Sequence, residues 1–324
     1  MKRIVCICVL LLAAVPALAQ TGSWARQKAG TMAWLHSVYF VNKDRGFAVG
    51  GNGTIMRTTD GGLTWQMRPA FGNDVIRDVY FLDEQNGWLV CEVNVYQLKT
   101  NDEPRTYIMK TTDGGETWNR VELKEFDVAL MRTVFSRSGR GWAFGEQGVI
   151  YTTHDSGETW SRLQSPTRRL LLGGIFVDDD RGWIVGAGGT IIQTSDGGET
   201  WYQSRLPQVE KTVRFTAASF VDNRLGWAVG SGGSVFRTNN GGRTWQRQES
   251  GVDVDLFDVK FLDAKEGWAV GAEGTIIHTV DGGVRWTTER SETQHPLERV
   301  FFTDKTRGWA VGFGGTVVAY QREG

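Results

Sequence analysis

Short apolar runs alternate with glycine-rich turns along this chain, and the runs recur at a regular spacing. The dipeptide Gly-Trp, replaced once by Gly-Phe, begins at seven positions: Gly46, Gly87, Gly141, Gly182, Gly226, Gly267 and Gly308. The intervals are 41, 54, 41, 44, 41 and 41 residues. A phenylalanine stands six residues before each of these glycines, and another apolar residue stands eleven before. Such a period indicates a repeat architecture with one supersecondary unit per repeat.

Each unit predicts four short strands. Alternating residues that end at the phenylalanine predict the first strand, and the Gly-Trp-Ala-Val-Gly segment predicts the second, as at 267–271. A tight turn followed by Gly-Thr-Ile-Ile, as at 274–277, predicts the third, and a Thr-Trp pair begins the fourth. Four strands in about 41 residues, repeated around a ring, are typical of a β-propeller. We therefore predict an all-β, seven-bladed propeller with four-stranded antiparallel blades.

The two ends of the chain predict how the ring closes. Fourth-strand tryptophans occur in only six units, at Trp65, Trp118, Trp160, Trp201, Trp245 and Trp286. The seventh unit ends without one, and Trp24 stands 41 residues before Trp65, one period earlier. An N-terminal strand around Trp24 should therefore complete the last blade, which removes the open sheet edges. Trp34 falls outside the register of the repeat, and we expect its ring to be exposed.

A polar turn motif precedes the fourth strand. Residues 58–65 fit the Asp-box pattern Ser/Thr-x-Asp-x-Gly-x-Thr-Trp, and related segments occur in the next five units. An aspartate in a hairpin turn accepts hydrogen bonds from nearby backbone N–H groups, and the glycines permit positive φ. Six such positions around a ring cannot form one active site. We predict a structural role for Asp60, Asp113, Asp155, Asp196, Asn240 and Asp281.

The first nineteen residues predict a secretory signal peptide. Lys2 and Arg3 precede an apolar run at 4–15, and Ala17-Leu18-Ala19 resembles a cleavage site. This run is short for a membrane span, and no later segment reaches the required length of about 20 residues. We expect residues 20–324 to form a single exported domain. Its compartment stays open between a periplasm, a thylakoid lumen and the outside of the cell.

Composition narrows the possible functions. Lys and Arg total 36 and Asp and Glu total 37, which argues against broad nucleic-acid or polybasic membrane binding. Cys6 and Cys8 belong to the leader, so Cys91 is the one cysteine left. A single cysteine forms no intrachain disulfide and no thiolate zinc cluster. The four histidines have no ligand spacing, and we expect no metal and no cofactor.

If the Asp boxes lie on one face, as in other propellers of this kind, we expect several arginines to lie on the opposite face. Those expected to bind a partner are Arg77, Arg132 and Arg299 at the starts of first strands, Arg168 and Arg169 in a loop of unit four, and Arg214 in unit five beside Lys211. A guanidinium offers planar, paired donors that suit carboxylates. We expect the insertion at 92–105, which lengthens unit two, to lie on the same face. Long loops on a rigid scaffold are common binding sites, so the insertion competes with the arginines as the candidate site.

The Asp boxes resemble those of BNR-repeat propellers, which include sialidases. The fuller unit, Phe-x5-Gly-Trp-Ala-Val-Gly-x2-Gly-Thr-Ile-x2-Thr-x-Asp-Gly-Gly-x-Thr-Trp, is similar to the photosystem II stability/assembly factor family, and the resemblance covers about residues 24–320. It implies a non-enzymatic propeller that binds a partner protein, which in photosynthetic members is a photosystem II reaction-centre subunit during assembly. We expect a monomer whose partner is a membrane-protein complex or its assembly intermediate.

Two enzymatic alternatives use the same fold. A sialidase would need an arginine triad, but the early Arg-Ile/Leu-Pro motif is absent. A glycoside hydrolase or carbohydrate-binding propeller would use facing carboxylates, and Asp78 and Asp258 both stand nine residues before their Gly-Trp dipeptides. Arg132 and Arg299 occupy the same position in other units. The two aspartates would then pair with these arginines instead of acting as catalysts.

Overall fold

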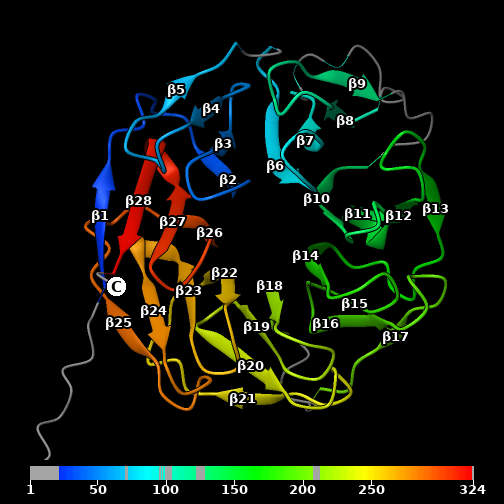
Figure 1. The fold of residues 1–324 in the computed structure, drawn as a ribbon. Coiled ribbons are helices and arrows are strands. Elements are labelled where there is room, and N and C mark those ends of the chain that lie inside the picture. Colours follow the sequence, from blue (N-terminus) through cyan, green and yellow to red (C-terminus); the bar gives the residue numbers. More distant parts are fainter. Residues whose placement is uncertain are drawn as a thin grey trace, which may run out of the picture.

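The strands of each repeat unit pair in sequence order to form one blade. The computed structural model describes residues 22–69, 72–94, 96, 98, 104–121, 128–206 and 212–322. In these residues the strands form seven four-stranded antiparallel sheets around a common axis (Figure 1). The predicted fold class and blade number are thus confirmed. The predicted leader at 1–19 and Lys211 lie outside the described residues.

In every blade the first strand of the unit is innermost and the fourth is outermost. The strands of the first six blades are β2(Leu35–Phe40), β3(Gly46–Gly50), β4(Ile55–Thr58), β5(Gln66–Met67); β6(Val75–Phe81), β7(Gly87–Glu92), β8(Thr106–Thr111), β9(Asn119–Val121); β10(Leu130–Phe135), β11(Gly141–Gly145), β12(Ile150–Thr153), β13(Ser161–Leu163); β14(Leu171–Phe176), β15(Gly182–Gly186), β16(Thr190–Thr194), β17(Tyr202–Gln203); β18(Phe215–Phe220), β19(Gly226–Gly230), β20(Ser234–Thr238), β21(Gln246–Gln248); β22(Leu256–Phe261), β23(Gly267–Gly271), β24(Ile276–Thr279) and β25(Thr287–Glu289). Three short 3-10 turns follow second strands, at η2(Glu146–Gly148), η4(Ala272–Gly274) and η5(Phe313–Gly315). No helix in the described ranges is long and apolar enough to cross a membrane.

The last blade joins the two ends of the chain. It contains β26(Leu297–Phe302), β27(Arg307–Gly312), β28(Thr316–Gln321) and, as its outermost strand, β1(Ser23–Gln27). Trp24 lies opposite Tyr320 in the antiparallel β1–β28 pair, which Figure 1 shows as blue beside red. The predicted closure by the N-terminal strand is therefore confirmed, and it leaves no unpaired edge on β28.

Aromatic stacking between blades explains the Phe-x5-Gly-Trp spacing. The Trp142 ring of one blade stacks on Phe176 of the next, with centroids 3.4 Å apart, and the equivalent pair recurs at all seven blade junctions. The phenylalanine ring also covers the glycine of its own Gly-Trp dipeptide. A Cβ added at Gly182 would lie 2.4 Å from the Phe176 ring. Only glycine leaves room for the ring, so packing explains why the phenylalanine and the glycine occur together in every unit.

Fourth strands begin two residues later than the sequence predicts, after the Thr-Trp pair and not at it. In each Asp box the tryptophan precedes the strand, which starts at the next residue, as Gln66 does after Trp65. The tryptophan instead meets the phenylalanine of its blade edge to face, as in Trp65 with Phe40. These outer strands are only two or three residues long, because the box uses the residues before them.

The Asp boxes are closed by hydrogen bonds within the turn. The Asp60 carboxylate accepts from the Thr64 N–H at 2.9 Å and from its hydroxyl at 2.5 Å, and the Thr58 hydroxyl also donates to it. The same contacts recur at Asp113, Asp155 and Asp196. Asn240 and Asp281 keep the backbone bond. The carboxyl oxygens are thereby engaged in holding the turn.

The second blade departs from the repeat at Cys91. Six units have glycine at this position, where an added Cβ would lie within about 2 Å of a backbone carbonyl, as at Gly186 beside the Leu170 oxygen. Cys91 replaces that glycine, and the β6–β7 pair continues one residue further, to Val75 and Glu92. The insertion begins at this point. Burial raises the pKa of the Cys91 thiol to about 12, so we interpret it as a packing residue.

Candidate protein-binding site at the channel mouth

A β-bulge in every innermost strand supplies the side chains at the mouth of the central channel. The register of each first strand against its second shifts by one residue near its start. Bulges re-aim a side chain and are common at the rims of closed β structures. The bulged residues are His36, Arg77, Met131, Leu172, Thr216, Phe257 and Glu298, and all seven line one cavity of about 390 Å³.

This mouth lies on the face opposite the Asp boxes. First strands begin beside the turn between second and third strands, where the Gly51 N–H donates to the Trp34 carbonyl at 2.8 Å. They end beside the Asp boxes, where the Gly61 N–H donates to the Asp44 carbonyl at 2.8 Å. The bulges stand at the beginning of the strands. The cavity therefore opens where the variable loops enter each blade.

Four of the six predicted partner-binding arginines meet at this mouth. Arg77, Arg132, Arg214 and Arg299 all line the cavity, beside the acidic residues Asp255 and Glu298. Arg77 forms an ion pair with Glu92 at 2.7 Å. The Arg214 side chain forms no ion pair among the described residues, and it lines the cavity together with Asp255.

Below the mouth, two buried ion pairs cross the channel. Arg299 of β26 reaches past the neighbouring blade to Asp78 of β6, with Nη2 and Oδ1 2.7 Å apart. Ser37 of the blade between them donates a hydrogen bond to the same carboxylate at 2.9 Å. On the other side, Arg132 of β10 lies 3.6 Å from the Asp258 carboxylate of β22. All four residues occupy the same position of the repeat unit. Because two are arginines and two are aspartates, their charges cancel.

Burial sets the protonation of these groups. It raises the pKa of Asp78 to about 6, although Arg132, Ser37 and backbone N–H groups favour the carboxylate. Burial also raises the pKa of Asp258 against the influence of Arg132, and the pKa of Glu298 against a hydrogen bond from Trp34. Burial and the nearby Arg77 lower the pKa of His36 to about 4. At neutral pH His36 is therefore uncharged, and the cations that line the mouth are arginines.

The remaining predicted residues lie further from the axis. Arg168 lines a separate hollow of about 500 Å³ with Arg162 and Ser165. The Arg169 guanidinium packs over Gly188, in the turn between β15 and β16. Of the insertion at 92–105, only residues 92–94, 96, 98, 104 and 105 are described. In that part Arg105 pairs with Glu92 and with Glu146 of the next blade. The six arginines thus form a central group of four and an outer pair.

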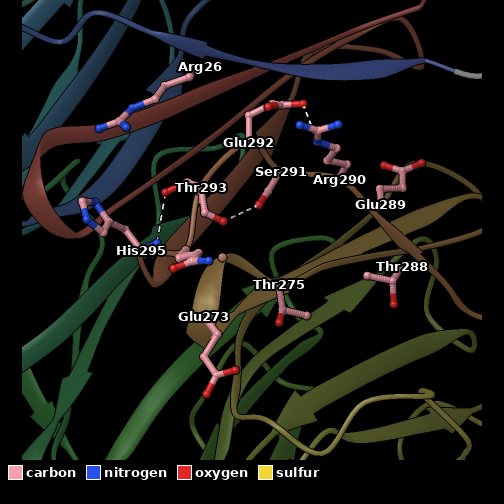
Figure 2. A pocket seen from close by; sticks show the side chains of 12 residues that line it. Arg26, Glu273, Thr275, Thr288, Glu289, Arg290, Ser291, Glu292, Thr293 and His295 are labelled. Carbon is pink, nitrogen blue, oxygen red and sulfur yellow. Dashed lines mark hydrogen bonds and ion pairs between the residues drawn. The ribbon is translucent and has the colours of Figure 1, made fainter.

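A more open hollow of about 720 Å³ lies between β1 and the segment that leaves blade six (Figure 2). Its side chains bond to each other: Arg290 pairs with Glu292 at 2.8 Å, and the Ser291 hydroxyl donates to the Thr293 carbonyl at 3.0 Å. Arg26 from β1 and Glu273 add opposite charges around it. None of the predicted partner-binding arginines lines it.

Sequence reasoning missed the other residues of the mouth. It selected the arginines but not His36, Phe257 or Glu298, which line the same cavity. The signal was present: each stands ten residues before its Gly-Trp dipeptide, beside the position that holds Asp78 and Arg299. Strict alternation would turn this residue into the blade, and only the bulge points it into the channel. In the described residues, no group of three or more His, Cys, Asp or Glu side chains is placed to hold a metal ion.

Fold, Asp boxes and channel mouth together define a seven-bladed propeller of the BNR-repeat class. Within that class the chain belongs to the family described as photosynthesis system II assembly factor YCF48, whose model matches residues 16–77, 71–170, 163–252 and 248–321. This confirms the resemblance found in the sequence.

Solved structures share the fold. YCF48 from Cyanidioschyzon merolae is 20% identical, covers 92% of this chain and 99% of its own, and superposes with a TM-score of 0.75. A structure of YCF48 bound to D1 peptide is also 20% identical, with coverages of 96% and 98% and a TM-score of 0.76. The GH74 xyloglucanase from Xanthomonas campestris is 13% identical over 91% of this chain and 53% of its own, with a TM-score of 0.70. Identities this low show the fold alone. No curated protein sequence matches the chain.

Proposed function

We propose that this protein is an exported, non-enzymatic assembly factor that binds a segment of a partner protein at the channel mouth. The observation that carries the proposal is the convergence of Arg77, Arg132, Arg214 and Arg299 on one cavity. In a chain with nearly balanced charge, such a group favours carboxylates, because guanidinium groups donate paired hydrogen bonds. Membership of the YCF48 family, and a YCF48 structure with a bound D1 peptide, support a protein partner.

Within this site, Arg77 and Arg214 are the groups that we assign to the partner. Arg132 and Arg299 are engaged with buried aspartates, and their side chains are only 16% and 11% exposed. Arg77 is one-third exposed, and Arg214 has no ion pair among the described residues. A partner carboxylate would thus meet these two first. The buried pairs below limit how far it can enter the channel.

The glycoside hydrolase alternative is less well supported. It requires Asp78 and Asp258 to face a substrate as free acid and base. The Asp78 carboxylate instead accepts hydrogen bonds from Arg299, Ser37 and the Thr133 N–H, and its side chain is 7% exposed. The xyloglucanase that shares the fold is matched over about half of its length. We therefore propose that this channel binds and does not hydrolyse.

Export is part of the proposal and rests on the leader-like residues 1–19. In a photosynthetic source, the partner would be a photosystem II subunit during assembly. In any other source, it would be a protein of the cell envelope. N-terminal sequencing of the protein purified from its native compartment tests this part. A start at Gln20 supports it, and a retained Met1 in the cytoplasm contradicts it.

The binding experiment compares two double variants that remove equal charge. Arg77→Gln/Arg214→Gln changes the mouth, and Arg243→Gln/Arg285→Gln changes the opposite, Asp-box face. The melting temperature of each variant is first compared with that of wild type to show that the variant is folded. Each variant is then used as bait in a pull-down from the native envelope fraction. We expect the first variant to lose a partner that wild type and the second retain. Recovery of the same partner by both variants would contradict the mouth as the binding site.

A further inference from the structure

Three exposed apolar residues lie at or beside the channel mouth. Trp34 lines its cavity, Phe313 packs against the Trp34 ring, and Met32 stands two residues before Trp34 and lines a neighbouring hollow. Met32 is 81% exposed, Trp34 41% and Phe313 46%. Trp34 lies just before β2, and Phe313 lies in the turn after β27 of the adjacent blade. We call these three residues the rim patch. Large apolar groups exposed together on one protein face are typical of interaction sites.

The repeat itself provides a reference for these positions. Where unit one has Met32, the other units have Asn73, Asp127, Arg168, Thr212, Asp253 and Gln294. Where unit seven has Phe313, the others have Gly51, Glu92, Glu146, Ala187, Ser231 and Ala272. The position of Trp34 is not aromatic in any other unit. The propeller fold therefore requires none of the three, yet they occur in adjacent blades, and Trp34 and Phe313 are in contact.

Trp34 is held in a fixed orientation. Its ring meets the Phe313 ring edge to face, with centroids 5.2 Å apart and planes at 86°. One side stacks on the His36 ring at 5.6 Å, and Glu298 lines the same cavity beside it. An aromatic group held this way loses little conformational entropy when a ligand covers it. Rigid aromatic anchors of this kind dominate many protein interfaces.

The rim patch adjoins the arginines. Trp34 lines the same cavity as Arg77 and Arg214, and Arg77 is close enough to His36 to lower the pKa of the imidazole. The surface thus presents an apolar anchor point beside guanidinium groups. This combination fits an extended peptide that carries a large apolar side chain close to one or more carboxylates.

We propose that the rim patch selects partner segments by binding one large apolar side chain, while adjacent acidic residues of the segment lie at Arg77 and Arg214. This inference rests on the proposed function and adds the sequence class of the partner. A sugar is a poorer fit, because His36 stacks on the Trp34 ring and Phe313 packs against its edge. The nearby cations are also arginines, which suit carboxylates.

The test uses short random peptides, displayed in a library and selected on the exported chain. The consensus peptide from wild type is then synthesised, and its affinity is measured by fluorescence anisotropy. We expect a consensus with acidic residues and one Phe, Leu, Ile or Met. Trp34→Ala should weaken binding of that peptide about tenfold, the usual effect of removing a central aromatic anchor. Phe313→Ser, which installs the residue found in unit five, should act in the same direction.

Tyr202→Ala is the matched control, because Tyr202 is 59% exposed on the outer strand β17 and far from the channel. It should leave the affinity unchanged. Two results would overturn the inference and leave the proposed function standing. One is an acidic consensus without an apolar residue, and the other is wild-type affinity in both the Trp34 and the Phe313 variants. A selection without acidic residues, or one unaffected by Arg77→Gln/Arg214→Gln, would overturn both. Trp34-dependent binding of xyloglucan oligosaccharides in place of peptides would also reject the inference.

Discussion

The indole of Trp24 and the phenyl ring of Phe302 lie edge to face, with centroids 5.8 Å apart and planes at 87°. The first residue belongs to β1 and the second to β26, so the contact joins the two ends of the chain. The other six blades contain the same pair within one unit, as in Trp286 with Phe261. Trp24 also donates a hydrogen bond to Glu289 of blade six at 2.7 Å.

Trp24→Ala should therefore lower the free energy of unfolding by about 3–5 kcal/mol, the usual cost of truncating a buried tryptophan. Urea denaturation measures this loss. Trp286→Ala is the control, because it removes the equivalent ring from a blade that is continuous in sequence. Only the Trp24 variant should also expose residues 22–27 to proteolysis in the native state. Equal protease resistance of both variants would contradict the closure role of β1.

The Arg299–Asp78 pair predicts a strong coupling. Arg299→Gln leaves the Asp78 carboxylate buried without its cation and should cost about 3–5 kcal/mol at neutral pH. Asp78→Asn in the same chain should recover much of that loss, because no uncompensated charge then remains. Urea denaturation of the two single variants and the double variant measures the coupling. Additive losses would show that the two side chains do not depend on each other.

Two classes of carboxylate predict opposite pH dependence. The pKa of Asp78 is raised from its ordinary value of 3.8 to about 6, so the folded protein holds this proton more tightly than the unfolded chain. Its stabilising contribution is complete below about pH 3.8 and is lost as the pH rises through about 6. The stability of wild type relative to Asp78→Asn should thus fall between pH 4 and pH 7. Denaturation at a series of pH values measures it.

Asp60 provides the contrasting case. Hydrogen bonds from the Thr64 hydroxyl and N–H lower its pKa from 3.8, so its contribution is present above pH 3.8 and is lost as the pH falls below it. The free energy of unfolding of wild type, measured relative to that of Asp60→Asn, should therefore decrease in acid. The same slope for both aspartates would reject the assignment of one to a buried channel and the other to an exposed turn.

Packing is predicted to require the glycine of each Gly-Trp dipeptide. In Gly226→Ala the new Cβ would lie 2.5 Å from the Phe220 ring, and such overpacking costs about 1–3 kcal/mol. Phe220→Leu in the same chain should reduce this cost, because the smaller side chain leaves room. Gly51→Ala is the control, since the nearest atom to its Cβ would be 3.9 Å away. Melting temperatures report all three, and an unaffected Gly226→Ala variant would reject the packing account.

Asn240 offers a natural test of the Asp box. Its amide donates to the Thr244 hydroxyl at 2.8 Å, where an aspartate would accept. Asn240→Asp should raise the free energy of unfolding by about 0.5–1 kcal/mol, because a hydrogen bond to a charged group is stronger. Asp196→Asn in the preceding blade should lower it by a similar amount. Urea denaturation at neutral pH measures both, and a shift of the same sign in the two variants would contradict the prediction.

The sequence predicted most of the fold because packing is encoded in the repeat. The blade number, the strand order and the place of Trp24 all follow from residues that recur with one period. The site was harder to predict. Arg132 and Arg299 could contact a partner protein, or they could pair with Asp258 and Asp78 of the same chain. Which of the two occurs depends on which blades face each other across the axis. Residue spacing does not contain that information, because it is fixed only when the ring closes. The rim patch was missed except for Trp34, since Met32 and Phe313 are not part of the repeat consensus.

The seven bulges described above also bear on how such a channel changes over evolution. A bulged residue has no partner in the strand ladder, so a substitution there leaves the pairing of its blade intact. The chain already uses seven different amino acids at these seven positions. The mouth can thus be rewritten one blade at a time, and descendants of the same scaffold can acquire new ligands without a new fold.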